Sequence, residues 1–347
     1  MTPNPPPNAR DNELLRTWPS SVPQYEQWYS LVNHPTQRFC FWFRYSLLTT
    51  STGVKEARVW AIPVDGDSPE VTRVLTAPLP QDAMKQRTGG AWGLEFGTQG
   101  LVEHGRMRGS VRDERGTVEW DLSFTPATHT VEALASPLLR KLVSKSSHRS
   151  PNSSVRMNGY VSVDGRRVEL GNASGHQGHT EGSRMQNEWV WGRAGEFEQD
   201  PSASFEGVAS RRGGARMCAF HVEAHGRSFA LNRLRHLKGP LGGLLGKGTR
   251  TEWQLGQWNM VGEEQGRRLQ VTMNAIGMAP LKVRYLDTDG SYRFNCAFPM
   301  ASCAMNITPA IAGDQPASTL LCKGKANMEF VASEPLQGTA DEYLPKL

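Results

Sequence analysis

The sequence predicts an all-β protein with two domains, and three observations support that prediction. Apolar and polar residues alternate along much of the chain, which is the period of a strand whose two faces differ. Strands recur at a spacing of roughly ten to fifteen residues, the rhythm of barrels and sandwiches rather than of βαβ units. A chain of 347 residues is too long for one ordinary hydrophobic core, so its length suggests two domains.

The chain begins with a polar segment, and a strong strand follows. Residues 1–22 are rich in proline and polar side chains, a composition typical of a flexible lead-in. Over residues 40–47 the side chains of Phe41, Phe43 and Tyr45 share one face. Alternation of this kind predicts a strand that buries one face and exposes the other.

Further strands with the same period are expected at residues 57–64, 100–112 and 117–124. Three tight turns between strands are predicted at Asp-Gly dipeptides. Such dipeptides suit tight turns because glycine accepts positive φ without steric cost. These turns are Asp65-Gly66, Asp164-Gly165 and Asp289-Gly290. The last of them predicts a hairpin over residues 285–298.

One helix and one domain boundary are also predicted. Ser136 can cap a helix over residues 136–143 and Pro137 suits its first position. Residues 147–154 have the composition of an inter-strand loop, and a second series of strands begins after Gly195. We therefore expect a flexible segment over residues 1–22, an N-terminal barrel over 23–195 and a C-terminal barrel over 196–347.

Net charge excludes little, but composition, cysteine spacing and the lack of long apolar runs bear on partners and setting. The chain is 38% hydrophobic and 21% charged with a net charge of +5, which is soluble globular composition. Its basic stretch, residues 211–250, lacks the interleaved aromatic residues of a nucleic-acid groove, so no nucleic-acid partner is expected. The five cysteines form no CxxC pair, and neither an apolar leader nor a membrane-spanning run is present. We expect a reducing, cytoplasmic setting and no transmembrane segment.

Three segments concentrate residues that could carry chemistry. They are residues 26–29, residues 41–45 together with Trp60, and residues 175–184 followed by 188–193. In the third segment His179 and Glu181 alternate in a strand and would share a face. Imidazole and carboxylate groups are the usual proton-transfer groups near neutral pH, and tryptophans supply apolar walls.

Each of these residues also has a purely structural interpretation. His176 and His179 could form a hydrogen-bonded pair that orients a loop, and tryptophans are often core residues. A zinc site would need a third ligand such as His221, His225 or Glu181, so no metal is expected. Arg44 could form a buried ion pair with Glu26 or another carboxylate.

These segments resemble a lipocalin-like two-barrel superfamily that includes carotenoid hydratases (hydroxyneurosporene synthases), tocopherol cyclases, decalin-forming Diels–Alderases and bacterial attachment-type proteins. The resemblance is carried by residues 26–29 and 41–45, and by residues 175–182 and 191–193. It implies two tandem lipocalin-like (calycin) antiparallel β-barrels with one or two short helices, and a pocket in or between them. The superfamily's reactions are hydration, cyclisation or pericyclic closure of polyenes and prenyl chains without an organic cofactor.

The third segment departs from the hydratase pattern, which reads roughly Gly-Tyr-His-Asp-His-Asn-Trp-Gly. His179 and both terminal glycines match, but Gly178 stands where the hydratases have an aspartate, and Glu181 stands at the tryptophan position. The loss of that aspartate puts hydratase activity in doubt, unless Glu181 supplies an acid from a different place.

The residues expected at the site fall into two groups. The expected catalytic residues are His176, His179, Glu181 and Arg44. The expected substrate-binding residues are Glu26, Trp28, Tyr29, Trp42, Trp60, Arg184 and Trp191. No cofactor is expected, and the sequence does not indicate an oligomeric state.

Three functions are compatible with these residues. The first is a cofactor-independent cyclase or isomerase, with hydratase and pericyclase as variants, acting on a hydrophobic polyene, prenyl or polyketide-like molecule. It predicts that His179→Ala and Glu181→Gln abolish turnover and leave the fold intact. The second is a non-catalytic carrier of a lipophilic ligand or pigment, and the third is an interaction protein whose barrels are filled by side chains.

Overall fold

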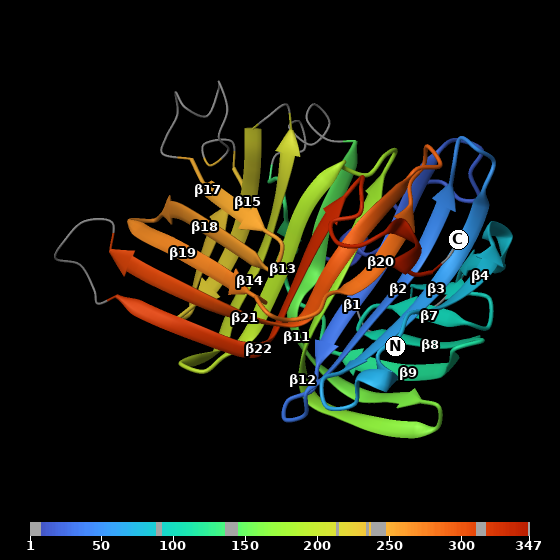
Figure 1. The fold of residues 1–347 in the computed structure, drawn as a ribbon, viewed down its shortest axis with the longest axis horizontal. Helices are drawn as coiled ribbons and strands as arrows, with labels where there is room; N and C mark the ends of the chain where they lie inside the picture. The colour runs from blue at the N-terminus through green and yellow to red at the C-terminus, as the bar shows by residue number, and fades with distance from the viewer. Residues whose placement is uncertain are drawn as a thin grey trace.

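The computed structural model describes residues 8–87, 92–135, 145–212, 215–233, 236, 248–309 and 317–345. These residues form two large antiparallel sheets that lie side by side (Figure 1). The N-terminal sheet has the strand order β4-β3-β2-β1-β12-β11-β9-β8-β7-β6-β5, with β10 paired to β11. The C-terminal sheet has the order β16-β15-β14-β13-β22-β21-β19-β18-β17, with β20 paired to β21.

The strands of the N-terminal sheet are β1 (Gln24–Asn33), β2 (Phe39–Thr49), β3 (Lys55–Asp65), β4 (Leu75–Pro80), β5 (Met84–Gln86), β6 (Gly93–Phe96), β7 (Gly100–Glu103), β8 (Arg106–Asp113), β9 (Gly116–Phe124), β10 (Val131–Glu132), β11 (Ser146–Val163) and β12 (Arg166–Gly182). Those of the C-terminal sheet are β13 (Glu188–Phe197), β14 (Asp200–Arg212), β15 (Ala215–Ala224), β16 (Arg227–Leu231), β17 (Arg250–Gln254), β18 (Gln257–Glu264), β19 (Arg267–Asn274), β20 (Leu281–Leu286), β21 (Tyr292–Pro309) and β22 (Ser318–Ala332).

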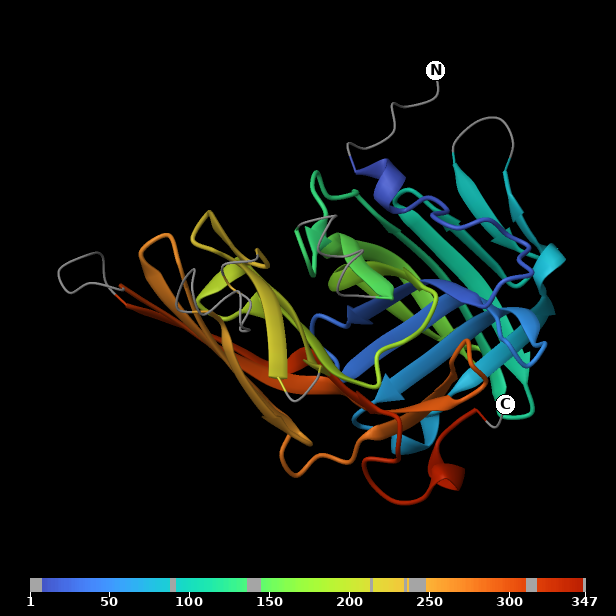
Figure 2. The ribbon, with the colours of Figure 1, turned by 90° about the horizontal axis from the view of Figure 1, so that it is seen from above.

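Each sheet curves until strands near its two ends meet. Strand β4 contacts β8 in the N-terminal sheet, and β16 contacts β18 in the C-terminal sheet. Figure 2 shows the two curved sheets from above. The predicted all-β architecture of two antiparallel barrels is confirmed.

Helical segments among the described residues are short 3-10 turns. They are η1 (Ala9–Asp11), η2 (Pro69–Val71), η3 (Gln81–Ala83) and η5 (Ala340–Glu342). The helix predicted over residues 136–143 lies outside the described residues. No helix in the described part of the chain is both long and apolar enough to cross a membrane.

The change from one sheet to the other comes earlier than the sequence suggested. Strand β12 ends at Gly182 in the N-terminal sheet, and β13 already pairs with β14 and β22 of the C-terminal sheet. The crossing therefore occupies residues 183–187 rather than the neighbourhood of Gly195. The glycines and alternating residues of β13 resemble those of β12, so pattern alone did not separate the two strands.

The inner face of each barrel is filled with apolar side chains. In the N-terminal barrel Trp28, Phe41, Phe43 and Trp120 belong to one continuous core. The C-terminal barrel has a comparable core around Trp258. Among the described residues, large apolar side chains therefore occupy much of each barrel's interior.

Strand β2 is buried on both faces, which differs from the prediction of one exposed face. Phe41 and Phe43 point into the N-terminal barrel. Cys40 and Trp42, on the opposite face, belong to a third apolar cluster that also contains Trp191 and residues of β20 and β22. The second sheet covers this face, and neighbours that distant are invisible to local alternation.

Residues 147–154 lie within β11, so the predicted inter-strand loop is wrong. The strand accommodates this polar stretch through irregular pairing with β12 between Arg149 and Val155. The Asn152 side chain donates to Gln177 Oε1 at 2.7 Å. Polar composition indicated a loop here because the sequence does not show that these polar groups are satisfied inside the sheet.

Residues 8–22 of the segment predicted to be flexible pack against the N-terminal barrel. Trp28 donates from Nε1 to Asn12 O at 2.9 Å, and Leu15 N donates to Glu26 Oε1 at 2.7 Å. Trp18 Nε1 donates to the other oxygen of Glu26 at 2.7 Å. This part of the segment therefore supplies hydrogen-bond partners for two buried side chains of β1, Trp28 and Glu26.

Candidate functional site

The candidate site is a pocket between the two sheets, with a volume of about 180 Å³. Its walls come from β1, β2, β11 and β12 on one side and from β13, β14, β15, β20 and β22 on the other. Aromatic lining residues include Tyr29, Trp42, Trp189 and Trp191. A concave, mainly apolar space with a few polar groups is the usual form of a small-molecule site.

At one end of the pocket, the guanidinium of Arg44 lies between two aromatic rings. Its Cζ is 4.0 Å from the Trp60 ring centroid and 4.3 Å from that of Tyr285. Arg44 donates from Nη1 to Gln27 Oε1 at 3.2 Å, while Nε has no hydrogen-bond partner among the described residues. Burial lowers the pKa of Arg44 to about 10, so the side chain remains a cation near neutral pH.

Glu329 of β22 lines the same pocket. Burial raises the pKa of Glu329 to about 7, although the charge of Arg44 and a hydrogen bond from Asn295 act in the opposite direction. Asn295 Nδ2 donates to Glu329 Oε2 at 2.9 Å and to the Tyr285 hydroxyl at 2.6 Å. A carboxyl group with this pKa can both give and take a proton near neutral pH.

A second polar cluster is centred on Glu206 of β14. Its Oε1 lies 3.2 Å from His148 Nε2 and 3.3 Å from His176 Nε2, and it accepts from Trp191 Nε1 at 3.1 Å. Ser150 donates to the same oxygen. Burial alone would raise the pKa of Glu206, but the two histidines outweigh burial and hold that pKa well below its usual range.

His148 connects the Glu206 cluster to the pocket. Its ring lines the pocket, and Tyr29 Oη and Thr180 Oγ1 lie 3.4 Å and 3.3 Å from its Nδ1. Because Nε2 donates to a carboxylate, Nδ1 is the nitrogen that can accept a proton. The arrangement Glu206–His148 is thus an oriented base beside an apolar space.

No model of a known protein family matches this sequence, and no curated protein matches it. Among the solved structures that this chain resembles, two match over the whole fold. A protein from Nitrosomonas europaea that carries the name AttH superposes with a TM-score of 0.52 at 12% identity, over 92% of this chain and 97% of the other. Kievitone hydratase from Nectria haematococca superposes with a TM-score of 0.51 at 8% identity, over 92% and 91%.

This chain has the two-barrel lipocalin-like fold. Both superpositions span the N-terminal and the C-terminal sheet, so the likeness concerns the pair of barrels and not one barrel alone. At these identities the likeness establishes the fold, and the chemistry must be argued from this chain's own residues.

Within the two-barrel fold, the structure brings six of the predicted site residues to the pocket or next to it. Tyr29, Trp42, Arg44 and Trp191 line it. Trp60 stacks on Arg44, and His176 contacts Glu206.

The other predicted residues of β1 and β12 lie on the opposite face, inside the N-terminal barrel. His179 is fully buried: it stacks on Trp28, with Nε2 3.0 Å from Glu26 Oε1 and Nδ1 2.7 Å from Asp11 O. Glu181 shares this face, as predicted, and pairs with Arg16 at 2.6 Å. None of these four predicted residues, Glu26, Trp28, His179 and Glu181, is part of the pocket lining.

Arg184 lies in the crossing between the sheets and pairs with Asp289. Its side chain is 43% exposed and is not part of the pocket lining. The predicted alternative of an ion pair between Arg44 and Glu26 is not formed, because Glu26 points into the barrel toward His179.

Gly178, where the sequence departs from the hydratase pattern, lies against Tyr29. It pairs with Tyr29 across β1 and β12, and a Cβ at Gly178 would lie 2.4 Å from Cζ of Tyr29. The Tyr29 ring therefore leaves no space for an acidic side chain at position 178. The acidic groups near the pocket come instead from Glu206 and Glu329, in the other barrel.

Sequence reasoning missed His148, Glu206, Glu329 and Tyr285. Each lies in a strand without a recognisable motif, and His148 lies in the stretch interpreted as a loop. A signal was present for two of them, since Glu206 lies between Phe205 and Gly207, and Glu329 lies between Met328 and Phe330.

Proposed function

We propose that this protein is a cofactor-independent enzyme that acts on a hydrophobic small molecule by general acid–base chemistry in the pocket between its barrels. Hydration of a carbon–carbon double bond is the reaction that suits the pocket best, and isomerisation or cyclisation of a polyene or prenyl chain are close alternatives. The observation that carries this proposal is that one largely apolar pocket is lined by two groups for proton transfer. These are Glu329, whose pKa is about 7, and His148, which contacts Glu206.

In hydration, one carbon of the double bond gains a proton and the other gains the hydroxyl of water. Protonated Glu329 gives the proton to carbon, and His148, oriented by Glu206, takes the proton that water loses. Arg44 binds a phenolate, enolate or carboxylate oxygen of the substrate, and its two flanking rings hold it in place. The enzyme recovers its starting state when the proton passes from His148 back to Glu329 through solvent.

The solved structures support this choice of reaction class. One of the two superposed proteins is a kievitone hydratase, and kievitone is therefore the first compound to test. Turnover would be followed by the gain of one water in the product and by uptake of oxygen from labelled water.

The test compares Glu329→Gln with wild type and with Glu169→Gln, a control at an exposed carboxylate (68% exposed). Loss of a general acid lowers the rate by about 10²–10⁴-fold, so Glu329→Gln should lose turnover and Glu169→Gln should keep it. Wild-type turnover should fall as the pH rises through about 7, because Glu329 then loses its proton. Full activity in Glu329→Gln together with loss in Glu181→Gln would favour the residues expected from sequence and overturn this assignment.

A non-catalytic carrier is the second candidate, and the aromatic walls of the pocket favour it, because they hold a lipophilic ligand without any proton transfer. A carrier binds the compound tightly and releases it unchanged. Mass spectrometry of lipophilic material that copurifies with wild type and with Glu329→Gln separates the two functions: a carrier holds the same compound in both, whereas an enzyme accumulates substrate only in the variant.

A further inference from the structure

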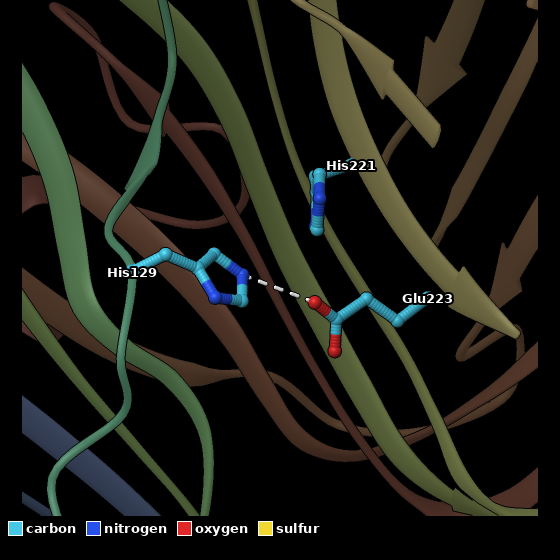
Figure 3. Close-up of side chains that lie close together, drawn as sticks. All are labelled: His129, His221 and Glu223. Carbon is cyan, nitrogen blue, oxygen red and sulfur yellow. Dashed lines mark ion pairs between the residues drawn. The ribbon is translucent and has the colours of Figure 1, made fainter. Parts of the chain in front are cut away.

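A second group of chemically active side chains lies outside the pocket lining. His129, His221 and Glu223 each offer one ligand atom, and these atoms all lie within 4.8 Å of one another. Figure 3 shows His129 and Glu223 pointing toward each other, with His221 beside them. His129 Nε2 is 3.1 Å from Glu223 Oε1.

The three residues come from both halves of the molecule. His129 lies between β9 and β10 of the N-terminal sheet. His221 and Glu223 are two positions apart on β15 of the C-terminal sheet, so both point from the same face of that strand. A ligand held by all three residues would therefore join the two sheets.

The surroundings of the group favour a cation. The Ser228 hydroxyl lies 2.8 Å from His221 Nε2 and orients the ring, as second-shell partners do at metal sites. Glu206 pairs with His221 in the register of β14 and β15, so a second acidic side chain lies beside His221 on the same face of the sheet. Two imidazoles and one carboxylate form a ligand set that zinc and similar divalent transition metals accept.

The geometry requires only a small adjustment. Ligand atoms at the usual distances from a tetrahedral zinc ion lie about 3.3 Å apart. His221 is buried and held, whereas the side chains of His129 and Glu223 are 56% and 32% exposed. The two exposed side chains can therefore rotate toward an ion anchored at His221.

We propose that His129, His221 and Glu223 bind one zinc-type divalent metal ion that clamps the segment before β10 onto β15. That segment continues into Ala133 and Leu134, and β15 contributes Met217–Ala219; both stretches line the pocket. The ion thus braces one edge of the pocket, whatever reaction the pocket supports.

The first test is calorimetric titration of the full chain, freed of metal by a chelator, with zinc chloride. We expect one zinc ion per chain, and a loss of affinity of at least about 10–100-fold in His129→Ala and in Glu223→Gln. His225→Ala is the matched control, since His225 is 50% exposed and follows β15 but does not belong to the group. Absence of saturable binding in wild type, or equal binding in His129→Ala, would overturn the proposal.

The second test asks whether the ion joins the two sheets. Amide hydrogen exchange of residues 127–135 should slow in wild type when zinc is added, and should not change in His129→Ala. Circular dichroism checks that this variant is folded, as expected for a substitution at an exposed side chain. Zinc binding without slower exchange in this segment would show that the ion does not clamp it, and would equally overturn the proposal.

Discussion

At the scale of single residues, the candidate site depends on two buried carboxyl groups whose pKa values are shifted in opposite directions. Glu206 receives donors from two histidines, Ser150 and Trp191, and stays ionised, whereas Glu329 has a single amide donor and its pKa rises to about 7. Pairs of groups whose surroundings push their pKa values apart are the usual basis of acid and base roles.

Glu329 should also make stability depend on pH. Its folded-state pKa is about 7 and its ordinary value is 4.5, so the folded protein binds the proton more tightly. The free energy of unfolding should therefore fall as the pH rises from about 4.5 to about 7, by about 3 kcal/mol in total. Urea unfolding of Glu329→Gln should lack this component, and Glu169→Gln should retain it. If the free energy of unfolding depended on pH in the same way in wild type and in Glu329→Gln, the pKa of Glu329 would not be raised in the folded protein.

At the scale of elements, the register of β1 and β12 decides which side chains reach the pocket. Trp28 pairs with His179 and Tyr29 pairs with Gly178. Successive side chains in a strand point to opposite faces, so Tyr29 enters the pocket while His179 enters the barrel. The sequence showed that His179 and Glu181 share a face, but local alternation did not show which face meets the pocket.

Gly178→Ala tests the close approach of these two strands. The new Cβ would lie 2.4 Å from the Tyr29 ring and would push that ring into the pocket. We expect the dissociation constant for a fluorescent lipophilic probe to rise about tenfold, which is 1.4 kcal/mol. Gly171→Ala on the same strand is the control, because a Cβ there has no neighbour within 4 Å. Equal affinity in the two variants would show that the Tyr29 ring does not shape the site.

At the scale of the whole molecule, the two barrels share a buried interface that forms both the pocket and a large part of the core. Arg193 of β13 is fully buried and donates to Ser174 of β12 at 3.0 Å. Asn33 of β1 donates to Pro299 O of β21 at 3.2 Å. The barrels therefore should unfold together and not as independent domains.

Val331→Asp tests this coupling. Val331 is 1% exposed within the apolar cluster between the sheets. A carboxylate there should cost roughly 3 kcal/mol, because it has to be desolvated or protonated. Chemical unfolding should show a lower midpoint for both barrels, and ligand binding should weaken. Ile276→Asp, at a position that is 61% exposed, should leave both unchanged. An unaltered midpoint in Val331→Asp would mean that the interface does not stabilise the barrels.

The sequence by itself determined the secondary structure class, because alternation and turn dipeptides are local properties of the chain. Its length indicated two domains, and the resemblance to the lipocalin-like superfamily implied two barrels. Four residues that the sequence predicted for a site, Arg44, Tyr29, Trp42 and Trp191, line the pocket, and they stand out in the sequence as charged or aromatic residues on strongly patterned strands. Only the tertiary structure decided that the pocket lies between the barrels and that β2 is covered on both faces. It likewise brought Glu329 near Arg44, and His129 near Glu223, across long stretches of chain. Those contacts depend on how two curved sheets pack, and no local pattern encodes the packing of residues that far apart in the sequence.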